Sequence, residues 1–111
     1  MPAHRYRVEL THGAQADLEA LHAYVAEHGS PEQAEELLDA LLDRVETLEQ
    51  FPERGAVPKE LAALGITEFR QLLVPPYRLI YRVIGKAVFV SIIADGRRDM
   101  QALLQQRLLG S

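Results

Sequence analysis

The sequence contains no cysteine among its 111 residues. This absence excludes a disulfide framework and any metal site built on thiolates, and it suits a reducing compartment. The N-terminus shows no basic start followed by an apolar core, and no apolar run reaches the length of a membrane span. We therefore expect a soluble, cytoplasmic protein that does not enter a membrane, and the length predicts a single domain, residues 1–111.

Several patterns that carry catalysis or ligand binding are also missing. The sequence has no glycine-rich phosphate loop, no serine in a nucleophile elbow and no thiol nucleophile. None of its histidines stands three to five residues from another, and no carboxylate cluster completes a ligand set. These histidines are His4, His12, His22 and His28. We therefore predict neither a metal site nor a cofactor.

The charge is divided unevenly along the chain. The formal net charge is −4, but residues 1–55 hold 4 Lys/Arg and 12 Asp/Glu, whereas residues 56–111 hold 8 Lys/Arg and 4 Asp/Glu. The first half is therefore at −8 and the second half at +4. The C-terminal half is the candidate surface for an anionic partner, which can be RNA, DNA or an acidic protein segment.

The first half predicts a strand and two helices. Residues 6–10 ("YRVEL") alternate with period two, as in a half-buried strand. Apolar residues then recur at helical spacing from residue 14 to residue 25, and Gly29 is a typical residue at the end of a helix. Ser30 and Pro31 favour the start of a second helix, which we expect to end at Phe51-Pro52. The short connection predicts an antiparallel helix hairpin.

The second half predicts three strands and a final helix. The strands are expected at residues 69–74 ("FRQLLV"), 77–83 ("YRLIYRV") and 87–93 ("AVFVSII"), the last of them central because it is the most apolar. One turn of helix is expected at 59–64, and Asp99 is a good N-cap for a helix over 100–109. This order predicts an α+β fold with helices on one face of a mostly antiparallel sheet.

A set of cationic residues in the second half is the main candidate for function. Its members are Lys59, Arg70, Arg78, Arg82, Lys86, Arg97 and Arg98. Arg78 and Arg82 share one face of the strand over 77–83 with Ile80 and Ile84. Such a face is consistent either with cover by another chain or with a solvated sheet face. The adjacent pair at 97 and 98 is consistent with a phosphate contact or with plain solvation of a turn.

Cleavage of RNA would require a base and an acid as well as cations. Arginine can stabilise the charged transition state, but it does not deprotonate. The nearby candidates for proton transfer are Glu60, Glu68, Asp95, Asp99, Tyr77 and Tyr81. The two tyrosines fall on the face opposite the strand's arginines, where we expect the core. The arginines can therefore hold a phosphate, but they lack an obvious partner for proton transfer.

Four segments of the chain together resemble one known family. They are "YRVELTHGAQADLEALHAYV", "VETLEQFPERG", "FRQLLVPPYRLIYRV" and "IIADGRRDMQALLQQRLL". In their order and spacing they resemble the RelE/ParE superfamily of type II toxin–antitoxin toxins, and the match covers nearly the whole chain. The resemblance implies a strand, an antiparallel helix hairpin, a three-strand antiparallel meander and a short C-terminal helix.

The resemblance also implies one of two activities. RelE-like toxins cleave mRNA on the ribosome with basic residues and often a tyrosine or histidine near the C-terminus, whereas ParE-like toxins lack that set and inhibit DNA gyrase. Arg70 and Arg97 or Arg98 fall at positions where such toxins bind phosphate, and they would be the catalytic arginines of a ribonuclease. Neither Tyr nor His follows Asp99, however, and Asp95 stands before Gly96, where such toxins carry His. The closing segment looks more like ParE.

We therefore expect a ParE-like toxin that inhibits gyrase and cell growth, acts in plasmid stabilization, and is not itself an enzyme. A ParD-like antitoxin is expected to neutralise it in a hetero-oligomer, and direct DNA binding without the antitoxin is not expected. The alternatives are a ribosome-dependent mRNA endonuclease and a family member that only binds its partner. The expected contacts with target or antitoxin are Lys59, Arg70, Arg78, Arg82, Arg97, Arg98, Met100 and Leu104.

The charge distribution suggests how such an antitoxin would bind. On this hypothesis its acidic residues contact the positive C-terminal half, while its apolar anchors contact the helix hairpin.

Overall fold

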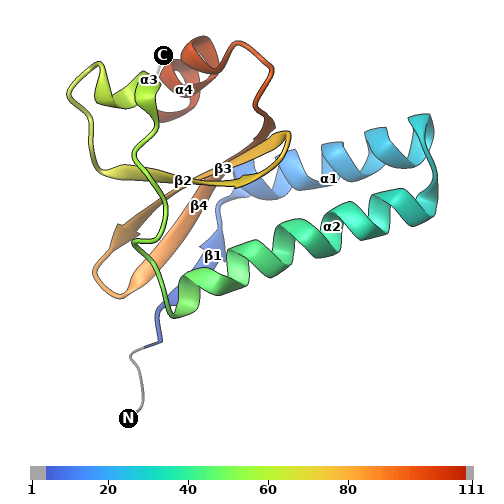
Figure 1. The fold of residues 1–111 in the computed structure, drawn as a ribbon, viewed down its shortest axis with the longest axis horizontal. Coiled ribbons are helices and arrows are strands. Elements are labelled where there is room, and N and C mark those ends of the chain that lie inside the picture. Colours follow the sequence, from blue (N-terminus) through green and yellow to red (C-terminus); the bar gives the residue numbers. More distant parts are fainter. Residues whose placement is uncertain (1–4, 110–111) are drawn as a thin grey trace.

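The computed structural model describes residues 5–109, which form a four-stranded sheet with helices on both faces (Figure 1). The strands are β1 (Arg7–Leu10), β2 (Phe69–Val74), β3 (Tyr77–Ile84) and β4 (Ala87–Asp95). The helices are α1 (His12–His28), α2 (Pro31–Glu46), α3 (Lys59–Ala62) and α4 (Met100–Leu108), with a 3-10 turn η1 (Thr47–Glu49). This order confirms the predicted α+β fold of strand, helix hairpin, meander and C-terminal helix.

The sheet joins the two ends of the chain. Its strand order is β1-β4-β3-β2, so the first strand lies beside the last. β1 pairs with β4 in parallel, with Leu10 opposite Val90, whereas the other pairs are antiparallel. β4 is central, as its apolar composition predicted, and five of its residues are at most 2% exposed: Val88, Val90, Ile92, Ile93 and Ala94.

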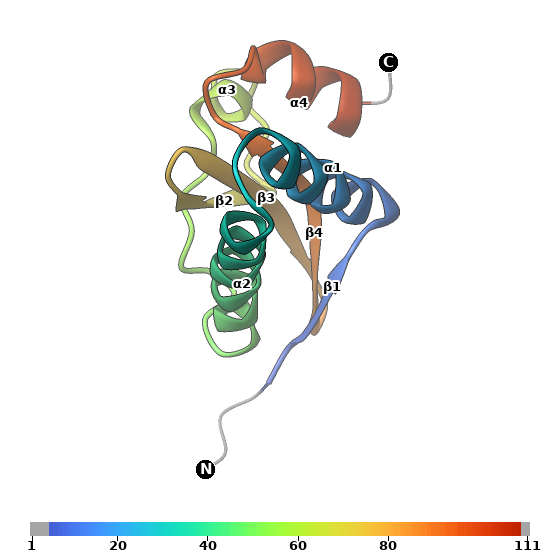
Figure 2. The same cartoon turned by 90° about the vertical axis from the view of Figure 1, so that its right-hand side faces the viewer.

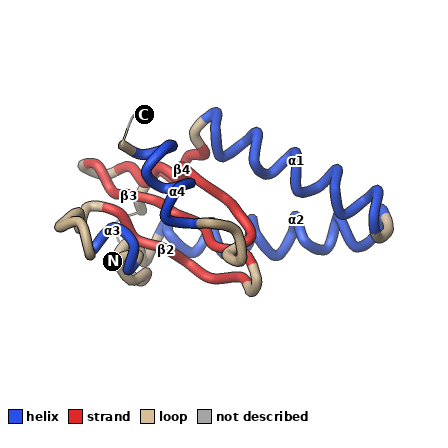
Figure 3. The backbone as a smooth tube through the Cα atoms, turned by 90° about the horizontal axis from the view of Figure 1, so that it is seen from above, coloured by secondary structure: helices blue, strands red, loops and turns tan. Residues whose placement is uncertain are grey.

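The hairpin of α1 and α2 covers one face of the sheet. Buried residues of both helices, such as Leu18 and Leu41, pack against Leu79 and Tyr81 of β3. Beyond this contact, the two helices project past the edge of the sheet (Figures 1 and 3). None of the helices between residues 5 and 109 is both long and apolar enough to cross a membrane.

The opposite face of the sheet is covered by α3 and α4 (Figure 2). Met100, Leu103 and Leu104 of α4 pack there against Ile80 and Ile92. The prediction that all helices gather on one face is therefore wrong. Since β3 and β4 carry apolar side chains on both faces, each face needs a cover, and this chain supplies both.

The helix ends follow the local capping signals. Ser30 accepts a hydrogen bond from the Gln33 amide at 3.0 Å, and Asp99 accepts one from the Ala102 amide at 3.1 Å, as their positions predicted. α2 ends at Glu46 rather than at Phe51-Pro52, and η1 follows it. There the Thr47 hydroxyl donates to the Arg44 carbonyl at 2.6 Å, a local bond that competes with regular helix.

Candidate functional site

The predicted cationic residues do not form a single cluster. Directly opposed residues of an antiparallel pair share a face. Arg70 is opposite Tyr81, on the face of the α1–α2 hairpin, whereas Arg82 is opposite Phe69, on the face of α4. Arg78 shares the face of Arg82 because it lies four residues before it on β3. The sheet itself therefore separates Arg70 from the other two.

Arg78 is engaged in a well-buried ion pair with Glu60 of α3. Its two terminal nitrogens lie 2.9 and 2.8 Å from the carboxylate oxygens, and its Nε donates to the side chain of Gln71 at 2.7 Å. The two charged side chains are only 11% and 12% exposed. The hydrogen bonds from Arg78 lower the pKa of Glu60 to about 2. Arg78 thus fixes α3 on the sheet and does not offer a free charge to a partner.

Arg70 and Tyr81 together hold the loop between η1 and α3. Nη1 of Arg70 donates to the carbonyl oxygens of Glu53 at 3.2 Å and Gly55 at 2.7 Å. The Tyr81 hydroxyl accepts the Gly55 amide at 3.0 Å. Tyr81 is fully buried, as predicted, and burial raises its pKa. Its phenol is therefore occupied inside the core rather than placed for proton transfer at the surface.

Arg82 remains partly open to solvent beside an aromatic ring. Its guanidinium lies 5.4 Å from the ring centre of Phe69 and 3.1 Å from the carboxylate of Glu68. The side chain is 40% exposed. Of the two arginines on this face of β3, only Arg82 can reach a ligand without breaking a buried contact.

Arg97 and Arg98 lie in the exposed turn between β4 and α4. The Arg97 side chain is 77% exposed and makes two hydrogen bonds with Asp95, at 2.9 and 2.6 Å. These bonds lower the pKa of Asp95 to about 2, so that this carboxylate is ionised at neutral pH and is a poor base. Among the described residues, the side chains of exposed Arg98 and Lys59 have no ion-pair partner. Together with Lys86, which is also exposed and has no ion pair among the described residues, they are the open cations of the predicted set.

The two apolar members of the predicted contact set are part of the core. Met100 is 3% exposed and Leu104 is fully buried between α4 and the sheet. In this structure they are not accessible to a partner, because the apolar stripe of α4 covers Ile80 and Ile92. The sequence showed the stripe but not what it packs against.

A polar junction between α1, β4 and α4 was not predicted from the sequence. Arg107 forms a two-point ion pair with Asp17, at 3.0 and 3.1 Å, and also donates to the Ser91 carbonyl at 2.9 Å. Asp17 in turn accepts the Ile93 amide at 3.0 Å. β1 pairs with β4 only as far as Val90, so these side chains satisfy the backbone groups that β1 leaves open. The sequence offered one signal for this junction: Asp17 lies beside the apolar stripe of α1, and Arg107 lies beside that of α4.

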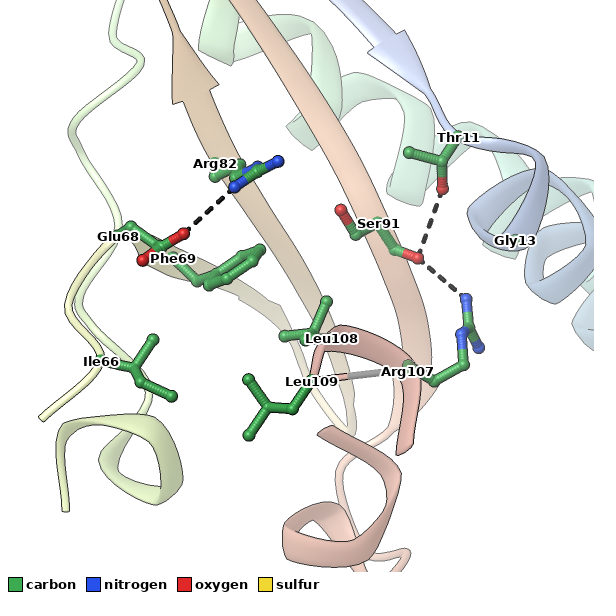
Figure 4. A pocket seen from close by; sticks show the side chains of 10 residues that line it. All are labelled: Thr11, Gly13, Ile66, Glu68, Phe69, Arg82, Ser91, Arg107, Leu108 and Leu109. Atoms are coloured by element: carbon green, nitrogen blue, oxygen red, sulfur yellow. Dashed lines mark hydrogen bonds and ion pairs between the residues drawn. The ribbon is translucent and has the colours of Figure 1, made fainter. Parts of the chain in front are cut away.

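This junction borders a cavity of about 450 Å³ next to the end of α4 (Figure 4). Arg82 and Phe69 stand on one side of it, Thr11 and Ser91 on the other, and Leu108 lies between them. The cavity mixes cationic and apolar walls, but its arginines are already paired with Glu68 and Asp17.

Between residues 5 and 109, no three His, Asp or Glu side chains gather closely enough to hold a metal ion. His4 lies outside the described residues. The exposed arginines can bind an anion, but the carboxylate beside them is paired and strongly acidic.

The fold is that of a RelE/ParE-type toxin. A sequence model of the family described as "ParE toxin of type II toxin-antitoxin system, parDE" matches residues 8–100. The chain therefore belongs to the ParE toxin family, and the resemblance inferred from the sequence is confirmed.

Two solved structures resemble this chain. The chain is similar to one from the chromosomal ParDE system of P. aeruginosa, with 25% identity and a TM-score of 0.69, over 84% of this chain and 98% of that one. It is also similar to a chain of the toxin–antitoxin complex RelBE2 from Mycobacterium tuberculosis, with 22% identity and a TM-score of 0.58, over 82% and 91% of the two chains. The second likeness shows the fold alone. None of the curated proteins matches this chain.

Proposed function

We propose that this protein is a cytoplasmic ParE-like toxin that stops growth by binding and inhibiting DNA gyrase, and that a ParD-like antitoxin neutralises it. The observation that carries the proposal is the turn between β4 and α4. It presents the Arg97 and Arg98 side chains to solvent, and the carboxylate beside them, Asp95, is already paired with Arg97 and strongly acidic. Such a turn can contact an acidic protein surface, but it lacks the chemistry that cleavage of RNA requires.

The other arginines of the predicted set support the same choice. A ribonuclease site needs several cations directed at one phosphate. Here Arg70 and Arg78 lie on opposite faces of the sheet, and each is held by protein groups. Neither is available to a phosphate beside Arg97, so we assign no catalytic residue.

A toxin of this kind needs a neutralising partner in the cell. The solved structures that resemble this chain come from toxin–antitoxin systems named ParDE and RelBE2. With the family match, these names support a ParD-like antitoxin encoded beside this chain, and a hetero-oligomer of the two proteins.

Two assays on one preparation test the target. The toxin is purified from its antitoxin complex, and its effect on supercoiling by purified gyrase is titrated. In parallel, the toxin is induced in cells and mRNA is mapped for codon-linked cleavage. We expect inhibition of supercoiling, intact mRNA and growth arrest that co-expression of the antitoxin reverses.

Each alternative function predicts a different result. Cleaved mRNA with normal supercoiling would identify a ribosome-dependent endonuclease and overturn the proposal. Normal growth, mRNA and supercoiling after induction would identify a family member that only binds its partner. Heat-treated toxin serves as the control for gyrase inhibition by contaminants.

A further inference from the structure

A β-bulge in β4 lies at the wall of the cavity next to the end of α4. Val90 and Ile92 are opposite consecutive residues of β3, so Ser91 between them has no partner on that strand. Pairing with β1 also ends at Val90. Bulges turn a side chain out of the regular alternation of a strand, and they are common beside binding sites. The residue affected here, Ser91, is one of those that line the cavity.

The bulge leaves the hydroxyl group of Ser91 open. The Ser91 carbonyl oxygen accepts hydrogen bonds from Arg107 at 2.9 Å and from the Thr11 hydroxyl at 3.5 Å. Figure 4 shows the Ser91 hydroxyl on the opposite side of the residue, turned towards Arg82. This hydroxyl has no hydrogen-bond partner among residues 5–109. A group that can both donate and accept a hydrogen bond is therefore available at the cavity wall.

Arg82 brings a positive charge to the same cavity. Its guanidinium lies over the ring of Phe69, which holds it in place by a cation–π contact. Its Nη1 donates to Glu68 at 3.1 Å, but the Glu68 side chain is 61% exposed, and ion pairs so open to water are weak. The other N–H groups of Arg82 make no hydrogen bond within the described part of the chain. They can therefore donate to a ligand while the aromatic contact is kept.

The cavity suits a small molecule with an apolar body. Its volume of about 450 Å³ is within the range of small-molecule sites. The lining includes three aliphatic side chains: Ile66, Leu108 and Leu109. Leu109 is 43% exposed, so part of this apolar surface is not used by the core. An apolar group that enters the cavity removes this surface from water and gains affinity.

The charges around the cavity favour a ligand with a single negative charge. Its two arginines are each accompanied by a carboxylate of this chain: Arg82 by Glu68, and Arg107 by Asp17. Both carboxylates would repel a phosphate dianion beside Arg82, whereas an organic carboxylate carries half that charge. A planar guanidinium also matches the two oxygens of a carboxylate.

We propose that this cavity binds a small organic carboxylate with an aromatic or branched apolar body. Its carboxylate accepts hydrogen bonds from Arg82 and from the Ser91 hydroxyl, and its body packs against Leu108 and Leu109. Because the ligand contacts both the sheet and the end of α4, its binding stabilises the fold. The inference does not depend on the target of the toxin, since the turn over residues 96–99 does not line the cavity.

Titration of the isotope-labelled, full-length toxin followed by NMR tests the ligand class. The probes are a naphthalene carboxylate and isovalerate, and the matched controls are the neutral naphthalene carboxamide, acetate, inorganic phosphate and adenosine monophosphate. We expect at least one of the two carboxylate probes to shift the amide signals of Ser91 and Leu108 and to raise the unfolding temperature. The carboxamide should bind at least about tenfold more weakly than its carboxylate, because it loses the charge-assisted hydrogen bonds.

Three variants test the residues of the site. Arg82→Gln should weaken binding of the carboxylate at least about tenfold, and Ser91→Ala about threefold. Arg98→Gln makes the same charge change on an exposed arginine outside the lining and should remain within about twofold. The amide spectrum of each variant shows whether it is folded.

Each contrary outcome overturns the inference in its own way. If neither carboxylate shifts the signals of the cavity up to about 10 mM, there is no site of this class. If Arg82→Gln and Ser91→Ala bind like wild type, the ligand lies elsewhere. Equal binding of the carboxamide removes the role of the charge, and tighter binding of phosphate or adenosine monophosphate identifies a phosphate site instead. Normal gyrase supercoiling with intact carboxylate binding refutes the proposed function and leaves this inference standing.

Discussion

Arg107 of α4 and Asp17 of α1 form a two-point ion pair, although they are 90 residues apart in the sequence. The pair is 27% and 18% exposed at its two side chains, and it satisfies the Ser91 carbonyl and the Ile93 amide at the open edge of β4. It therefore connects the first helix, the central strand and the last helix.

Arg107→Ala is expected to lower the free energy of unfolding by about 2 kcal/mol, because it leaves Asp17 and the Ser91 carbonyl without their partner. Urea denaturation followed by circular dichroism measures the change. Gln106→Ala, an exposed neighbour on the same helix, should change stability by less than about 0.5 kcal/mol. Equal effects of the two substitutions would show that the junction contributes little.

Gly13→Ala tests the close approach of α1 to the same arginine. A Cβ at Gly13 would lie 2.6 Å from Nη2 of Arg107, so the guanidinium must move away from Asp17. We expect a loss of about 1 to 2 kcal/mol in the wild-type background. In an Arg107→Ala background the same change should stabilise by about 0.5 kcal/mol, because alanine favours helix over glycine. A double-mutant cycle with no coupling between the two sites would contradict this account.

The Glu60–Arg78 pair predicts a dependence of stability on pH. Arg78 lowers the pKa of Glu60 from 4.5 to about 2, so the pair stabilises the fold above pH 4.5. This contribution is lost progressively as the pH falls from 4.5 towards 2. Glu60→Gln should lower the free energy of unfolding by about 3 kcal/mol at pH 7, because it leaves the charge of Arg78 largely buried and without a partner. Urea midpoints of wild type and variant should therefore converge as the pH falls, and a constant difference between them would refute the pairing.

Arg98→Glu tests the turn as a contact for the target. Arg98 is exposed and has no ion-pair partner in the described chain, so its reversal should leave the fold intact. We expect the toxin concentration that half-inhibits gyrase supercoiling to rise about tenfold. Lys86→Glu makes the same charge change in the turn between β3 and β4. It should shift the half-inhibitory toxin concentration by less than about twofold. If both variants inhibit like wild type, the turn does not contact gyrase.

Local patterns in the sequence predicted the elements of this fold well. The strand at 69–74 and the caps at Ser30 and Asp99 are where their residues indicated. Each depends on a few neighbouring residues, through alternation or through one side-chain bond to the backbone. The end of α2 was misplaced because its apolar spacing continues into η1, which a periodic pattern does not distinguish from helix.

Contacts between distant residues were not predictable in the same way. Ile80 and Ile84 occupy the same face of β3, yet Ile80 is fully buried under α4 whereas Ile84 is 48% exposed. Nothing in the strand itself says how far α4 extends over it. Likewise, the sequence shows arginines at 70 and 78 but not that Gly55 and Glu60 hold them. A cationic set in a sequence is therefore weaker support for a binding site than the same set found unpaired in a structure.

The parallel pairing of β1 with β4 also sets the order in which the chain can mature. Residues 7–10 have no strand to pair with until residues 87–90 have been synthesised. Contacts so distant in sequence form late in folding and slow it. A growing chain can build the α1–α2 hairpin early, but its sheet stays open until the central strand arrives. Any surface that depends on the closed sheet therefore appears only after residues 87–90 have been synthesised and have paired with β1.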